Sequence, residues 1–99
     1  MNQISEIEAT FQRLSTRSGV KACIVTTLDG SIIKSSLSEA DIKQFVSSVP
    51  QLVDQAKKVV ASWDKNDFIK FFSLRSNLYE FLVYPSDQYL LIVIQNNKN

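Results

Sequence analysis

Very few residues of this chain have the type and spacing that catalysis or metal binding requires. The sequence contains no histidine, and its single cysteine, Cys23, lies between Ala22 and Ile24 in an apolar stretch. A cysteine acts as a nucleophile or a metal ligand when a base or further ligands accompany it. Cys23 has neither, so we interpret it as a small buried side chain, and we expect no catalytic residue.

The carboxylates also lack the spacing of a site. Residues 64–67, DKND, are acidic enough to suggest a calcium loop, but they lack its central glycine and its closing glutamate. Glu6 and Glu8 are two residues apart, a spacing at which side chains do not face each other on a helix. No glycine-rich phosphate loop is present. The sequence therefore predicts no cofactor and no metal.

Charge and composition exclude two further classes of partner. The chain has 99 residues with a net charge of +1, and Lys57-Lys58 is its only adjacent basic pair. Nucleic-acid-binding proteins usually carry a basic patch, so we expect no nucleic-acid partner. The longest apolar run, residues 89–94, is far too short to span a bilayer, and we expect no direct membrane binding. A lone cysteine and no opening secretion signal favour a cytoplasmic location.

Two helices are expected from apolar spacing. Residues 4–17 carry apolar side chains three and four residues apart, which is typical of a helix: Ile4, Ile7, Phe11 and Leu14. Ser5 with Glu8 forms a possible capping box, and Asn2 is an equally good cap. Gly19 follows, where a left-handed residue ends a helix.

The second helix is expected over residues 38–63, with Ser38 as its cap together with Asp41. Its apolar stripe is roughly 140° wide, broader than one contact with a sheet needs. The stripe comprises Ile42, Phe45, Val46, Val49, Leu52, Val53, Ala56, Val59, Val60 and Trp63. Pro50 removes a helical hydrogen bond, so we expect a kinked helix, with two short helices as the alternative. Trp63 is expected in the core, with an interface anchor as the alternative.

Five strands are expected, over residues 20–27, 31–36, 68–75, 78–84 and 88–95. Asp29-Gly30 suits the turn of the first hairpin. In the last strand, alternate residues on both faces are apolar, whereas a strand that faces water on one side alternates apolar and polar residues. The sheet must therefore be covered on both faces.

The resulting order is α-β-β-α-β-β-β in one domain, residues 1–99. We predict an α/β (α+β) fold whose five-stranded antiparallel sheet has the strand order 2-1-5-4-3, with a helix on each face. Residues 68–75 then form an open edge with Lys70 as the only interior charge. Such an edge tends to pair with another chain, and the simplest partner is a second copy related by a two-fold axis.

Three segments resemble the Roadblock family of dynein light chains: GVKACIVTTLDGSIIKSS (19–36), NDFIKFFSLRS (66–76) and YEFLVYPSDQYLLIVIQN (79–96). This resemblance covers essentially the whole chain. It implies a homodimer with a ten-stranded sheet that binds a short segment of the dynein intermediate chain. It also implies a cytoskeleton-associated location, in either a cytoplasmic or an axonemal (ciliary) motor.

The resemblance places the dimer surface on the long helix and on the third strand. The residues implied are Phe45, Val49, Leu52, Phe68, Ile69, Phe71, Phe72 and Leu74. A heterodimer with a paralogue is an alternative. Relatives with this fold also serve as scaffolds or regulators of small GTPases, and fold alone does not separate that role from the dynein role.

Overall fold

The computed structural model describes residues 3–97, with side chains from residue 6 onward. Asn2 and the side chains of Ile4 and Ser5, which entered the prediction of the first helix, lie outside this range. The elements are α1 (Gln3–Ser15), β1 (Val20–Thr27), β2 (Ile32–Ser35), α2 (Glu39–Trp63), β3 (Phe72–Arg75), β4 (Tyr79–Pro85) and β5 (Tyr89–Asn96). All strand pairs are antiparallel, and the order β2-β1-β5-β4-β3 confirms the predicted fold class.

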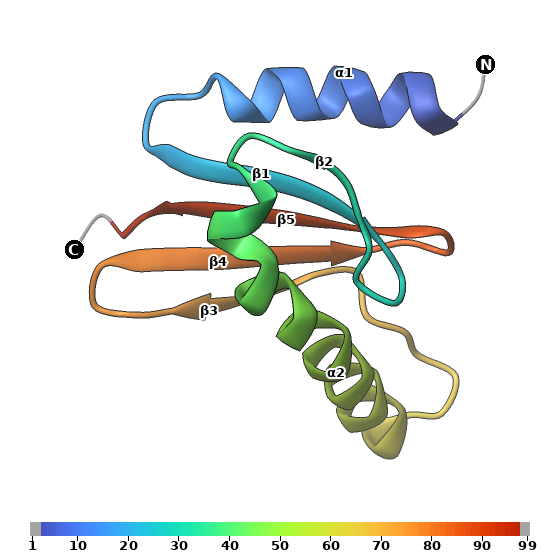
Figure 1. The fold of residues 1–99 in the computed structure, drawn as a ribbon. Coiled ribbons are helices and arrows are strands. Elements are labelled where there is room, and N and C mark those ends of the chain that lie inside the picture. Colours follow the sequence, from blue (N-terminus) through green and yellow to red (C-terminus); the bar gives the residue numbers. More distant parts are fainter. Residues whose placement is uncertain (1–2, 98–99) are drawn as a thin grey trace.

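A helix covers each face of the sheet, because alternate residues of the central strands point to opposite sides. In β1, Ala22 and Ile24 face α2, whereas Cys23 and Val25 face α1. In Figure 1, α2 crosses in front of the strands and α1 runs beside β1. The α2-side core comprises Ala22, Ile24, Ile42, Val46, Val49, Val53, Val83, Leu90 and Ile92. The α1-side core comprises Phe11, Cys23, Val25, Leu91 and Val93.

The connection after α1 follows from local hydrogen bonds. The Thr16 hydroxyl donates to the carbonyl of Gln12 (3.0 Å), a bond that competes with helix continuation. The helix accordingly ends at Ser15, two residues earlier than predicted. Gly19 has φ of +88°, as expected of a glycine that redirects the chain after a helix.

The helix α2 is continuous through Pro50, so the alternative of two short helices is wrong. Its ribbon changes direction partway along its length in Figure 1, as expected where a proline removes a hydrogen bond. The predicted capping box is not formed as expected. The Ser38 hydroxyl donates to the carboxylate of Asp41 (2.8 Å) and makes no bond to a backbone N–H.

The third strand is shorter than predicted, because residues 68–71 do not pair with β4. The β3–β4 ladder stops at the pair Phe72 and Val83. Continuing the register would place residue 70 opposite Pro85, which has no N–H to donate. The segment before Phe72 therefore lies at the edge of the sheet without joining it.

The core position predicted for Trp63 is also wrong, since its side chain is 92% exposed. Figure 1 shows the C-terminal end of α2 extending beyond the strands. Val59, one turn earlier on the same stripe, is exposed as well. The apolar stripe therefore continues past the surface that it covers.

Candidate protein-interaction surface

Several large apolar side chains are exposed on α2, on the segment that leads into β3 and on β3 itself. We call this set the α2–β3 surface; it comprises Leu52, Val59, Trp63, Phe68 and Leu74. Phe68 is 72% exposed and Leu74 is 49% exposed. Single exposed apolar residues are ordinary, but several on adjoining elements are typical of an interaction site.

Strand β3 adds an unpaired backbone edge to this surface. Within residues 3–97 only β4 pairs with it, and it is the last strand of the sheet. Its charged residue, Arg75, forms an ion pair with Glu80 of β4 (3.4 Å) and so lies at the closed end of the hairpin. The rest of the strand, residues 72–74, carries no charge. An edge of this kind can template pairing with another strand.

Four of the residues predicted for the dimer surface are exposed: Leu52, Phe68, Phe71 and Leu74. Phe71 stacks on Tyr84, with ring centroids 5.1 Å apart. Because Tyr84 pairs with Leu91 of the α1-side core, this aromatic pair lies on the α1 side of the sheet. The prediction thus combined residues from two faces.

The other four predicted residues are at least partly covered within one copy. Val49 is buried in the α2-side core, and Phe45 and Phe72 pack against that core. The Phe45 ring lies 5.8 Å from that of Phe81 on β4. Ile69 is half-buried. Phe45, Val49 and Phe72 thus help to position α2 and β3, and contact of these four residues with a second copy stays a prediction.

Val59 was missed as an exposed residue, and exposure of Trp63 had entered the prediction only through the alternative of an interface anchor. Their only sequence signal is the width of the stripe, which exceeds what one sheet contact needs. Periodicity assigns a residue to a face of a helix, but it does not show where the helix passes beyond its sheet.

Cys23, the one thiol, is fully buried and unreactive by position. Burial raises the pKa of the Cys23 thiol to about 11, so the thiol is neutral at physiological pH. Its backbone N–H donates to the Ser36 hydroxyl (2.9 Å). These observations support the interpretation of Cys23 as a small core side chain.

The acidic residues serve local turns. Asp64 accepts a hydrogen bond from the N–H of Asn66 (2.9 Å), and Asp67 accepts one from the N–H of Phe68 (2.8 Å). Hydrogen bonds from the Thr27 hydroxyl and from Ser31 lower the pKa of Asp29 in the first hairpin. Within residues 3–97, no three His, Cys, Asp or Glu side chains gather to hold a metal ion. Neither α1 nor α2, as described, has the length and hydropathy to cross a membrane.

Comparison with known proteins gives the family. Residues 6–96 match the Roadblock/LC7 domain. A Roadblock/LC7 domain from Streptomyces avermitilis is similar at 8% identity and a TM-score of 0.77, over 86% of this chain and 72% of that one. MglB from Myxococcus xanthus is similar at 17% identity and a TM-score of 0.75, over 99% of this chain and 81% of that one.

A third similar structure is MglC from Myxococcus xanthus, at 13% identity and a TM-score of 0.56, over 93% of this chain and 81% of that one. At such identities the three structures show a shared fold. The match over residues 6–96 covers nearly the whole sequence, and this chain therefore belongs to the Roadblock/LC7 domain family.

Proposed function

We propose that this chain is a non-catalytic module that self-associates and acts as a scaffold or regulator of a small GTPase. The observation that carries the proposal is the α2–β3 surface, which leaves large apolar side chains beside an unpaired strand edge. A surface of this composition suits contact with a protein, whereas it offers no group for general acid–base work.

Self-association follows from the geometry of β3. Pairing of β3 with the same strand of a second copy across a two-fold axis joins two five-stranded sheets into one of ten strands. The pairing satisfies the open backbone groups and removes Leu74 from water. A solved MglB is described with a tetrameric arrangement, which supports association between copies of this fold. A paralogue with a similar edge could replace the second copy.

The GTPase role is supported better than the dynein role by the solved relatives. They include MglB and MglC, and the Thermus thermophilus MglB is described as a gliding protein. None of the solved relatives described above is named as a dynein chain. The resemblance to Roadblock proteins admits both roles, and the relatives therefore favour the scaffold or regulator of a GTPase.

The dynein light chain is the second candidate, and the segment YEFLVYPSDQYLLIVIQN at residues 79–96 favours it. In that role an amphipathic segment of an intermediate chain would lie along the two α2 helices, anchored at i, i+3, i+4 and i+7. A cytoplasmic, cytoskeleton-associated location belongs to this role.

Affinity purification of the tagged full chain from its native cells, followed by mass spectrometry, separates the two roles. We expect to recover a small GTPase with the wild-type chain. Leu74→Asp places a charge in the proposed dimer surface and should reduce the amount of GTPase recovered. Leu78→Asp serves as the control, because Leu78 is exposed but lies in the β3–β4 turn. Recovery of dynein intermediate chain without any GTPase contradicts the proposal and supports the dynein role.

A further inference from the structure

A hollow with a volume of about 390 Å³ lies beside α1, near the β2 edge of the sheet. Its apolar wall is formed by Ile7 of α1, Val25 of β1, Ile33 of β2 and Tyr89 of β5. Glu8, Lys34 and Gln88 complete the lining. Ligand sites in proteins are commonly apolar hollows of about 300–1,000 Å³ with a few polar groups. This hollow fits that description at its small end.

A β-bulge directs Ile33 into the hollow. Val25 pairs with Lys34, and Thr26 pairs with Ile32, so Ile33 has no partner on β1. In a regular strand, Ile33 and Lys34 would point to opposite faces, but both line the same hollow. Bulges commonly re-aim a side chain in this way. Ile33 is 58% exposed, so the bulge holds an apolar group in contact with water.

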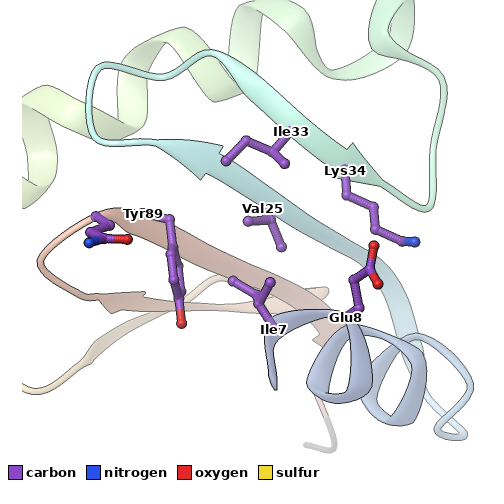
Figure 2. A pocket seen from close by; sticks show the side chains of 7 residues that line it. Ile7, Glu8, Val25, Ile33, Lys34 and Tyr89 are labelled. Atoms are coloured by element: carbon purple, nitrogen blue, oxygen red, sulfur yellow. The ribbon is translucent and has the colours of Figure 1, made fainter. Parts of the chain in front are cut away.

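Figure 2 shows the side chains of Ile33, Val25 and Ile7 following one another from β2 to α1. Tyr89 lies at one side of this row, and Glu8 and Lys34 lie together at the other. The hollow is therefore apolar along its floor and charged at one end.

The two charges have opposite signs. Neither Glu8 nor Lys34 forms an ion pair within 4.0 Å among the residues that the structure describes. The Lys34 ammonium lies 5.1 Å from the centre of the Phe11 ring, a cation–π contact that leaves its outer side open. An anionic lipid or fatty acid would be attracted by the charge of Lys34 but repelled by that of Glu8, so the two effects would oppose each other. A neutral occupant meets no such conflict.

We propose that this hollow binds a large apolar side chain, such as leucine, on a peptide segment of a partner protein. The apolar wall covers the side chain, and the Gln88 amide with the two charged groups can hydrogen-bond the adjacent peptide N–H and C=O groups. Strand β2 lies at the opposite edge of the sheet from β3. Among the residues that the structure describes, none fills the site in a single copy, and pairing through β3 would leave it open in both copies of a dimer. The site therefore does not depend on the proposed self-association.

Methyl NMR on the full chain tests this site with three probes: N-acetyl-leucine methylamide, N-acetyl-alanine methylamide and octanoate. The leucine probe should shift the methyl signals of Ile7, Val25 and Ile33 saturably. Its dissociation constant should be on the order of 1 mM, as expected of so small a ligand. The alanine probe should bind at least about tenfold more weakly, because it buries fewer apolar carbons.

Ile33→Ser should weaken the leucine probe by about tenfold without changing the mass of the assembly in solution. Leu78→Ser is the matched control, since Leu78 is 64% exposed and lies in the β3–β4 turn, which does not line the hollow. Absence of saturable shifts in the wild-type chain overturns the proposal, whether or not the variants fold. Tighter binding of octanoate than of the leucine probe also overturns it, in favour of a lipid site.

Discussion

Gly30 and Pro50 are two single residues that together fit the first hairpin against α2. Gly30 has φ of +99°, and a Cβ added there would lie 3.1 Å from Cγ of Pro50 and 3.7 Å from the carbonyl oxygen of Val46. That carbonyl is the one whose helical hydrogen bond Pro50 removes. The turn of the hairpin thus approaches α2 at the point where the proline interrupts its hydrogen bonds.

Gly30→Ala should therefore destabilise the protein more than Gly19→Ala. Both glycines have positive φ, so each alanine carries a cost of roughly 1–2 kcal/mol, but no atom of the described residues lies within 4 Å of a Cβ at Gly19. We expect Gly30→Ala to lower the free energy of unfolding by about 1 kcal/mol more, measured in urea. Adding Pro50→Ala should recover part of that excess. Equal losses at the two glycines would contradict the close contact.

The Cys23 thiol should make stability depend on pH in the alkaline range. Burial raises its pKa from 9.0 to about 11, so below pH 9.0 the folded and unfolded chains both hold the proton. Between those values the unfolded thiol ionises first, and the free energy of unfolding should fall by about 1.4 kcal/mol per pH unit. Urea denaturation below pH 9.0 and near pH 11 measures the loss. The Cys23→Ala variant should lose less unfolding free energy over this pH range, because it lacks the thiol and keeps every other titrating group.

At the scale of elements, the edge strand β3 has one covered and one open apolar side chain. Phe72 packs against the α2-side core, whereas Leu74, two residues on and on the same face, is 49% exposed. Phe72 therefore supports the fold of one copy, and Leu74 is available to a second copy.

Substitution by aspartate should separate these two roles. Leu74→Asp should leave a folded monomer, because the charge enters the proposed contact between copies without entering the core. Phe72→Asp should lower the melting temperature sharply or prevent folding, because it places an unpaired charge against the core. Circular dichroism with size-exclusion chromatography measures both. A dimeric Leu74→Asp of wild-type stability would exclude β3 as the contact.

The sequence predicted the helices and strands that can be recognised from the apolar pattern within a single segment. Apolar residues on both faces of the segment that became β5 indicated a sheet covered on both sides, and the strand order followed. The length of β3 was wrong because pairing depends on Pro85, which is distant in sequence. The hollow at Ile33 was missed because the direction of the Ile33 side chain depends on a bulge. A bulge is a property of the register between two strands, which the sequence pattern of one strand does not contain.

At the scale of the whole molecule, the sheet has two unlike edges. Strand β2 carries Lys34 and contains a bulge opposite β1, and both features discourage pairing with another strand. Strand β3 is uncharged over residues 72–74 and lies beside the exposed side chains of α2. The molecule therefore has one edge suited to self-association, and two-fold pairing there closes without leaving a second such edge.

Light scattering coupled to size-exclusion chromatography is the sharpest test of self-association through β3. The measurement uses the purified wild-type chain at micromolar concentration. We expect a single species of twice 11.2 kDa, about 22 kDa, in which Trp63 has a partner to contact. A stable, folded species of 11.2 kDa would rule out self-association under these conditions, because the α2–β3 surface would then remain open to water.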